Sequence, residues 1–242
     1  MLKRYVYILL IALFALFAMA SSNPQNNEMT LGLGQAPLFR VGPGRDSNET
    51  QVYSFTYTQA AVLFDADGRI IDLEVDALEV STPNYDGHSM PHFSGWPGSP
   101  EPSFTNHDTE KVDGTTATTE EAIASEVDNW KTKRDRGDDY GMNEKDWHKQ
   151  MDNWEDLFIG MTVDEVDVFY AKYTNDRNGR PLNPETENDD EKAKYDKLSD
   201  ADKQIVVDVR TGATMSINDS HGHVPAAIRD AWNKRKPVRS ME

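Results

Sequence analysis

The chain has no cysteine among its 242 residues, which restricts the chemistry that its side chains can perform. Thiol nucleophiles, disulfides, Fe–S clusters and Cys-based zinc sites are excluded. Any redox role must therefore use an organic cofactor or a haem ligated by other residues. A candidate group of hydroxyl side chains near a carboxylate lies toward the C-terminus, in the segment Asp208-Val209-Arg210-Thr211-Gly212-Ala213-Thr214-Met215-Ser216.

This segment resembles the flavinylation motif of the FMN-binding domain family, which is an Asp, two variable residues, Thr or Ser, Gly, Ala and Thr. The five matching positions are Asp208, Thr211, Gly212, Ala213 and Thr214. Five specified positions match by chance on the order of once in a thousand chains of this length. The family includes the flavin subunits of sodium-pumping NADH:quinone reductases and Rnf complexes, and the resemblance extends over roughly Gln51 to Trp232.

The resemblance implies that a separate flavin transferase esterifies the phosphate of FMN to the hydroxyl of Thr214. It implies an electron carrier that is a substrate of the transferase rather than an enzyme with turnover, with an unidentified electron donor and acceptor at the membrane or outside the cell. A plain turn built from small residues is the alternative. The cofactor-binding residues expected in this segment are Thr214, Asp208, Thr211, Gly212, Ala213, Met215 and Ser216.

A second candidate region is the loop over 81–102, which is punctuated by Pro and Gly yet carries several large side chains. These are Tyr85, Met90, His92, Phe93 and Trp96. We expect at least one aromatic group of this loop to lie against the isoalloxazine ring, and Tyr85 and His92 are the predicted contacts. Closure of the core is the alternative. We expect no metal site at His88 and His92, because Gly87 and Pro91 oppose the helix that their spacing requires.

Alternating side chains predict the elements that must position these groups. Residues 51–64 alternate aromatic and polar side chains up to an Asp-Gly turn at 65–68. Ile71 to Ala77 then alternate apolar and acidic residues. Strict alternation around Asp-Gly is typical of an antiparallel hairpin. The turn lacks the later ligands of a calcium loop, so we expect no metal there.

Helix signals fill the rest of the chain. Capping boxes predict helices after Thr118 and Thr162, and the apolar run over 204–209 predicts a strand that leads into the Thr214 motif. A last helix, Val224 to Trp232, should direct its N-terminus toward the flavin phosphate. His221 and His223 stand beside this helix, as phosphate contacts or as exposed loop residues. The predicted fold is a single α+β domain, an antiparallel sheet with packed helices and long polar loops.

The N-terminal residues predict export. Lys3 and Arg4 precede 15 apolar residues and an Ala-Met-Ala sequence at 18–20. Residues 1–20 are therefore predicted to be a signal peptide cleaved before Ser21, or alternatively an N-terminal membrane tether. We expect a linker over 21–50 and the FMN-binding domain over 51–236, with insertions at 101–156 and 174–200. The protein is expected to be extracytoplasmic, secreted or held at the outer face of the cytoplasmic membrane.

The charge of the chain excludes one class of partner. With 25 basic and 42 acidic residues, the net charge is −17, which argues against nucleic-acid binding. A rival hypothesis remains, an exported non-redox module that binds cell wall or glycan by stacking sugars on Trp130, Trp147 and Trp154. Packing of these three rings on helix faces is the simpler expectation.

Overall fold

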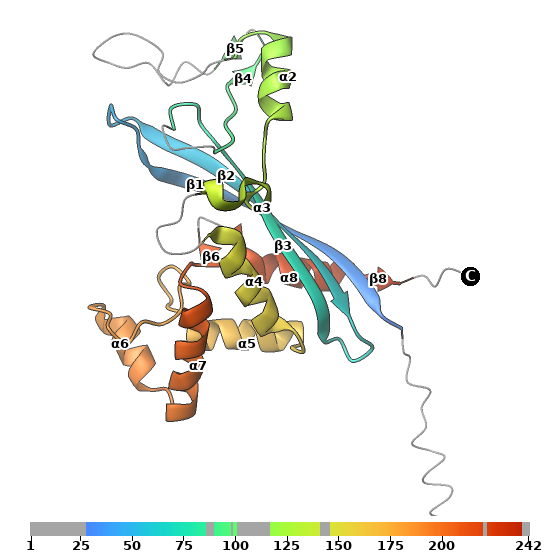
Figure 1. Cartoon of the computed structure of the whole chain (residues 1–242), viewed down its shortest axis with the longest axis vertical. Helices are drawn as coiled ribbons and strands as arrows, with labels where there is room; N and C mark the ends of the chain where they lie inside the picture. Colours follow the sequence, from blue (N-terminus) through green and yellow to red (C-terminus); the bar gives the residue numbers. More distant parts are fainter. Residues whose placement is uncertain are drawn as a thin grey trace, which may run out of the picture.

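A computed structural model describes residues 28–85, 90–97, 99–100, 117–140, 146–219 and 222–238. Its centre is a long, twisted antiparallel sheet with the strand order β3-β2-β1-β8 (Figure 1). Helices cover one face of this sheet, so the predicted α+β fold is confirmed. No helix in this part of the chain has the length and apolar character needed to cross a bilayer. The four strands are β1 (Thr30–Arg45), β2 (Gln51–Phe64), β3 (Ile70–Ser81) and β8 (Lys236–Pro237).

The N-terminal region holds the first correction. The predicted signal peptide over 1–20 lies outside the described residues, as does the chain up to residue 27. The predicted linker over 21–50 is wrong for residues 30–45, because they form strand β1. This strand pairs with β2 in unbroken register from Thr30 opposite Phe64 to Val41 opposite Tyr53. Its glycines and Pro37 lower the intrinsic preference for a strand, which is why its sequence suggests a linker. Pairing with β2 overrides this local preference.

The predicted hairpin of β2 and β3 is confirmed. Asp65 donates its backbone N–H to Arg69, and Gly68 closes the turn with a positive φ of 80°. One detail differs from the prediction, because an irregularity at the end of β2 shifts the register. As a result Ile70 is buried, whereas Ile71 is 43% exposed.

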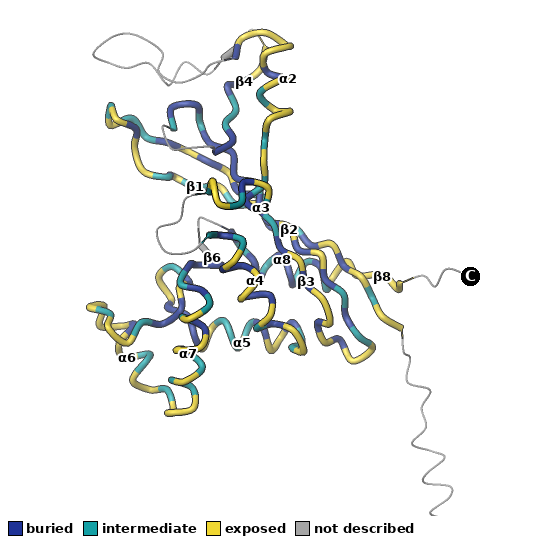
Figure 2. Tube along the Cα trace, in the orientation of Figure 1, coloured by how far each residue is buried: buried dark blue, intermediate teal, exposed yellow. Residues whose placement is uncertain are grey.

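Buried residues follow the sheet strands over their length (Figure 2), and the side chains of these residues change in character from one end to the other. Near the β2–β3 turn they are apolar, with Val62, Phe64 and Ile70 fully buried. Farther along, hydroxyl and charged side chains replace the apolar ones although they are buried as well. The polar members are Ser54, Thr56, Thr58, Glu79 and Ser81. Since buried polar groups need partners, this half of the face requires polar residues opposite it.

The helix predicted over Val224 to Trp232 is confirmed as α8 (Val224–Lys234), and it lies against β1 and β2. The contact is close because β1 presents glycine to the helix at two places. A Cβ at Gly32 would overlap the carbonyl oxygen of Ala231, and a Cβ at Gly34 would overlap that of Ala227. These glycines serve the approach of two backbones rather than chain flexibility.

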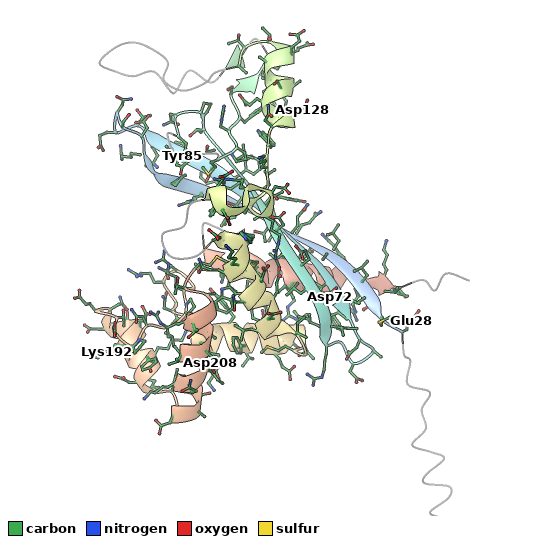
Figure 3. The ribbon with its side chains drawn as sticks, viewed as in Figure 1. Glu28, Asp72, Tyr85, Asp128, Lys192 and Asp208 are labelled. Carbon is green, nitrogen blue, oxygen red and sulfur yellow. The ribbon has the colours of Figure 1, made fainter. Side chains whose placement is uncertain are left out.

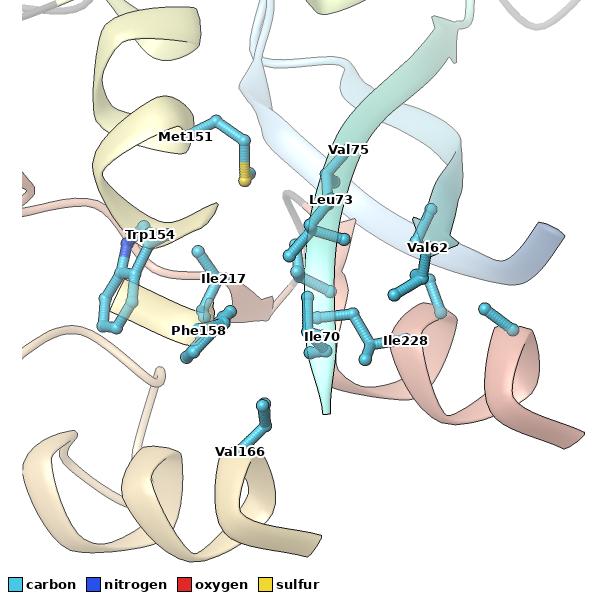
Figure 4. Packing of buried hydrophobic residues seen from close by; sticks show 14 of the residues in the cluster. Val62, Ile70, Leu73, Val75, Met151, Trp154, Phe158, Val166, Ile217 and Ile228 are labelled. Carbon is cyan, nitrogen blue, oxygen red and sulfur yellow. The ribbon is translucent and has the colours of Figure 1, made fainter. Parts of the chain in front are cut away.

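Three further helices complete the core beside β3: α4 (Trp147–Phe158), α5 (Val163–Tyr173) and α7 (Asp200–Gly212) (Figure 4). Trp154 and Phe158 of α4 have no exposed surface. The last part of the expected insertion at 101–156 thus packs in the core as α4, and its status as an insertion stays a prediction. The capping box at Thr162 and Glu165 that begins α5 is confirmed.

The predicted strand over 204–209 is wrong, because these residues lie within α7. The run Ile205-Val206-Val207 has β-branched side chains that favour a strand. However, Val206, Val209 and Ala213 are all fully buried, at positions i, i+3 and i+7. This is the spacing of one helix face, and Ser199 caps the helix by accepting from the Asp202 N–H.

The remaining elements of the described chain are short, and they are β4 (Gly95–Trp96), β5 (Ser99–Pro100), α2 (Glu120–Asp128), α3 (Lys133–Arg136), the 3₁₀ helix η2 (Gly137–Tyr140), α6 (Asp189–Asp196), β6 (Asn218–Asp219) and β7 (Gly222–His223). Of these, α2, β4 and β5 lie away from this core at the other end of the sheet (Figure 1). In the predicted insertion at 174–200, Leu182 is fully buried against Tyr173 and Val206, so this segment also contributes to packing. Helix α2 begins after Thr119, one residue later than predicted.

Glu155 of α4 makes the stability of the core dependent on pH. It accepts from the Val75 N–H and from Arg134, both at 2.6 Å, yet burial raises the pKa of its carboxyl to about 7. The folded protein thus keeps a proton that the unfolded chain loses near the ordinary glutamate pKa of 4.5. Stability should therefore fall as pH rises between these two values. Urea unfolding across this range should show the decrease, and Glu155→Gln should remove that part of the slope.

Candidate functional site

The Thr214 motif lies in the segment that follows α7. Ala213, Met215, Ser216 and Ile217 are buried, whereas Thr214 is partly exposed. Helix α7 ends at Gly212, two residues before Thr214, so the backbone at Thr214 is not helical. A hydroxyl on irregular, partly exposed backbone is accessible to a modifying enzyme. In this respect the residues present fit a phosphoester at Thr214.

Gln150 of α4 holds this segment by accepting hydrogen bonds from its backbone. Its Oε1 accepts from the N–H of Thr214 at 2.8 Å and from the N–H of Met215 at 2.9 Å. The Thr214 hydroxyl lies 3.4 Å from the same oxygen. Gln150 is 1% exposed, so two backbone N–H groups and the hydroxyl all depend on one buried side chain. Gln150 was not predicted from the sequence, because nothing local distinguishes it from a surface glutamine.

The two small residues of the motif have a packing role. A Cβ at Gly212 would overlap the side-chain oxygen of Asn153 on α4, and Ala213 is fully buried in the core. The absence of larger side chains therefore permits α7 to pack closely on α4. This packing keeps Thr214 next to Gln150.

The first two motif residues lie on α7 itself. Asp208 is exposed and accepts from Gln204 at 3.0 Å within the helix. Asp208 lies within the helix, so it cannot cap a turn. Thr211 is exposed and its hydroxyl donates to the Val207 carbonyl at 2.9 Å. Neither residue has a described contact with Thr214, and their roles in flavinylation stay predictions.

Met215 and Ser216 turn away from solvent. The Met215 side chain belongs to the hydrophobic core. The Ser216 hydroxyl donates to the Asn178 carbonyl and accepts from the Asn218 N–H at 3.2 Å. Of the two hydroxyl-bearing residues after α7, Thr214 is thus partly exposed and Ser216 is buried.

The N-terminus of α8 lies close to this segment. Val224 donates its N–H to the Ile217 carbonyl at 2.8 Å. Ile217 lies three residues after Thr214 in the chain. His223 precedes the helix and is half-buried, and burial lowers the pKa of its imidazole. A lowered pKa favours the neutral ring near pH 7, so His223 does not supply a positive charge to a phosphate. His221 lies outside the described residues.

The loop residues predicted to contact the flavin lie in the other half of the molecule. Figure 3 shows Tyr85 beside the far end of the β1–β2 hairpin and Asp208 on α7. The His92 ring lies 3.4 Å from the Glu126 carboxylate of α2, and Phe93 packs edge-on against Trp96 and Trp130. The structure thus gives these side chains contacts among themselves. Contact of Tyr85 or His92 with a flavin stays a prediction.

Between these two regions lies a group of charged and aromatic residues that was not predicted from the sequence. Glu79 of β3 is 1% exposed and accepts from Arg40 at 2.8 Å and from Lys133 at 3.0 Å. Arg136 of α3 stacks 4.5 Å from the centre of the Tyr140 ring. Only the tertiary fold brings these residues together, from β1, β3 and α3–η2. We refer to Arg40, Glu79, Lys133, Arg136 and Tyr140 as the cationic cluster.

Helix α4 connects the cationic cluster to the Thr214 segment. Trp147, at the start of α4, has its ring 5.8 Å from the Lys133 ammonium and 6.5 Å from the Tyr140 ring. Gln150 follows one helical turn later. The cationic cluster and Thr214 are therefore held by neighbouring turns of the same helix.

One group of potential metal ligands in the described residues is already paired with a lysine. Asp138, Asp146 and His148 bring one ligand atom each within 4.8 Å of one another. However, the Lys149 ammonium forms ion pairs with both aspartates. The lysine offsets one of the two carboxylate charges.

Gln150→Ala should loosen the Thr214 segment. The substitution leaves the buried N–H groups of Thr214 and Met215 without their acceptor, a loss of about 1–3 kcal/mol for each group. We expect faster hydrogen exchange at these two amides and a lower free energy of unfolding. Gln150→Glu, which keeps an acceptor oxygen, should restore much of the protection. Gln204→Ala, at an exposed position of α7, is the control. Equal hydrogen exchange at the Thr214 and Met215 amides in both alanine variants would contradict the role of Gln150.

Comparisons with known proteins give one relative. The chain is 34% identical over 227 residues to a protein of Desulfitobacterium hafniense named chlorophenol reductase, and the match includes 89% of this chain. It includes 61% of the relative, so the chain spans about three fifths of that protein's length. No protein-family model and no solved structure matches the chain. The relative's name is that of a redox protein.

Proposed function

We propose that this chain is an extracytoplasmic electron-transfer flavoprotein that carries FMN as a phosphoester on Thr214. The observation that carries the proposal is the partly exposed Thr214 hydroxyl, held by buried Gln150 at the motif position that the FMN-binding family modifies. The similarity to a protein named chlorophenol reductase supports a redox function. The apolar leader with its Ala-Met-Ala sequence supports export.

The attachment step is a transfer of FMN from FAD by a separate transferase. The Thr214 oxygen forms a bond to the phosphorus of the FMN half, and the pyrophosphate bond of FAD breaks. AMP leaves, and the hydroxyl proton is released. The protein gains FMN less one water, and nothing is oxidised or reduced in this step.

The chain's own residues would bind and position the cofactor. The Gln150 side chain fixes the backbone on both sides of the modified oxygen, and the packing of Gly212 on Asn153 holds α7 in place. Bound FMN would supply one- and two-electron transfer. The electron donor and acceptor are proposed to be separate proteins or small molecules at the membrane or outside the cell.

The rival glycan-binding hypothesis loses two of its candidate stacking rings, whereas Trp96 is 71% exposed. Trp147 is 3% exposed and Trp154 is fully buried, so neither ring can stack on a sugar. Trp130 packs against Phe93 and donates its indole N–H to the His92 carbonyl. These three tryptophans pack within the protein, as the simpler expectation held.

The mass of the intact protein tests the proposal. The chain is coexpressed with a flavin transferase in a host that exports it, and the mature protein is analysed by mass spectrometry. We expect a gain of one FMN less one water and flavin absorbance that persists after denaturation. If the chain gains nothing under conditions that load an established member of the FMN-binding family, covalent attachment is refuted. Flavin that is released on denaturation would show noncovalent binding instead.

A further inference from the structure

The face of the sheet opposite the buried core is apolar along β1 and β2. Its members are the alternate residues of β1 from 31 to 41 and of β2 from 53 to 63, which lie opposite one another in register. None of these twelve residues is charged, in a chain of which 28% of the residues are charged. An antiparallel sheet with one face in water normally carries polar residues on that face. We refer to these twelve residues as the open face.

One half of the open face is a patch of large exposed side chains. Phe39 is 68% exposed and Val41 is 65% exposed, and their cross-strand neighbours Phe55 and Tyr53 are exposed as well. The Phe39 and Tyr53 rings stack with their centres 6.0 Å apart and their planes 18° apart. Such exposure shows that no described element covers these four residues. A contiguous exposed apolar patch of this kind is typical of an interaction site.

The rim of the open face carries opposite charges on its two sides. One row across the four strands consists of Lys236 of β8, Leu31 of β1, Leu63 of β2 and Asp72 of β3. Residues paired in register share a face of the sheet, so this row has a cation at one end and a carboxylate at the other. Both charged residues are exposed.

This charge arrangement makes the open face complementary to itself in one orientation. A half-turn about an axis that runs along the strands, between β1 and β2, places Lys236 of one copy opposite Asp72 of a second copy. A half-turn about an axis across the strands would instead lay β3, with Asp72 and Glu74 exposed, on the β3 of the second copy. Contacts of the first kind are isologous and close on themselves as a dimer.

We propose that the open face binds a second copy of this chain, so that two sheets pack face to face in a two-fold symmetric dimer. Aligned sheets pack about 10 Å apart. Phe39 of one copy would lie opposite Phe55 of the other. In the same way, Val41 would lie opposite Tyr53.

The chemistry of the open face favours a second copy over a membrane. Each copy has a net charge of −17, which opposes close approach to an anionic lipid surface. The same charge opposes association of two copies, but the open face itself brings no carboxylate into the contact. Stable interfaces use roughly 20–30 residues from each partner, and the twelve residues of the open face with its rim approach the lower limit. We therefore expect a dimer with a dissociation constant of about 1–10 μM.

Sedimentation of the purified protein without flavin, over a range of concentrations up to about 100 μM, tests this inference. Phe39→Lys places a charge at the centre of the contact in both copies and should raise the dissociation constant about a hundredfold. Val168→Lys is the matched control, because Val168 is 66% exposed on α5 and lies outside the open face. It should leave the dissociation constant unchanged. Circular dichroism establishes that each variant is folded, and Val41→Lys replaces Phe39→Lys if that variant does not fold.

A charge exchange tests the orientation of the two copies. Lys236→Glu and Asp72→Lys each create two contacts between like charges in the proposed dimer, so each should weaken dimerisation about fivefold at low salt. The double variant exchanges the two charges and should restore the affinity of the wild type. Contacts that do not place these residues opposite each other would show no such restoration.

Three results would overturn the inference. The first is a monomer at every concentration, and a monomer that binds vesicles of phosphatidylcholine would assign the open face to a membrane instead. The second is a dimer that both Phe39→Lys and Val41→Lys leave unchanged. The third is a double charge variant that dimerises no better than the single variants. Because the protein carries no flavin in these measurements, none of the results depends on flavinylation at Thr214.

Discussion

Thr214→Ala should abolish covalent FMN loading completely. The phosphoester needs a hydroxyl oxygen at this position, and alanine has none. The fold should persist, because Thr214 is partly exposed and its backbone N–H can still donate to Gln150. Intact mass after coexpression with a flavin transferase is the measurement. Wild type should gain one FMN less one water, and the variant should gain nothing.

Two other hydroxyls provide matched controls. The Thr211 hydroxyl is exposed and bonded within α7, so Thr211→Ala should at most slow the loading. Ser216 is buried and bonded to the Asn178 carbonyl, so Ser216→Ala should keep the gain in mass while lowering stability. Asp208→Ala should reduce the loading rate more than the stability, because Asp208 is exposed on α7. A Thr214→Ala protein that still gains FMN would move the attachment site to another hydroxyl.

Gly34→Ala should strongly destabilise the fold. The new Cβ would overlap the Ala227 carbonyl oxygen, which belongs to the backbone of α8 and cannot rotate away. Helix α8 must then move off the sheet, and overpacking of this kind costs about 3 kcal/mol or more. Urea unfolding of the purified variant measures the loss.

Leu33→Ala is the matched control for Gly34→Ala. Leu33 is the neighbour of Gly34 on β1 but points to the uncovered face, where it is 56% exposed. Its replacement should change the free energy of unfolding by less than about 1 kcal/mol. If Gly34→Ala were equally mild, the close contact between β1 and α8 would be wrong.

Local patterns in the sequence predicted some elements and failed for others. The β2–β3 hairpin and the capping box of α5 follow from short-range rules, namely alternation around Asp-Gly and a paired Thr and Glu. β1 was missed because its glycines suggest flexible chain, although α8 requires them at the contact. In α7 the β-branched run Ile205-Val206-Val207 concealed a helical spacing of buried residues.

The candidate site was predictable only where it is contiguous in the chain. Thr214 was found through a motif of neighbouring residues. Gln150 lies 64 positions away from Thr214, and Glu79 and Lys133 are brought together from separate elements. No local signal marks such pairs, because the same residue types are common on solvated helices. Their importance follows from burial, which only the tertiary structure reveals.

The pairing of β8 with the start of β1 determines how the protein can be tethered. Val238 donates its N–H to the Met29 carbonyl at 2.9 Å, and Pro237 lies opposite Thr30 in the sheet. Both ends of the described fold therefore leave from the same edge. A membrane anchor joined before residue 28 or after residue 238 would therefore hold the domain in nearly the same orientation relative to the membrane. A circular permutant that joins these ends by a short linker and opens at the β1–β2 turn would preserve every helix.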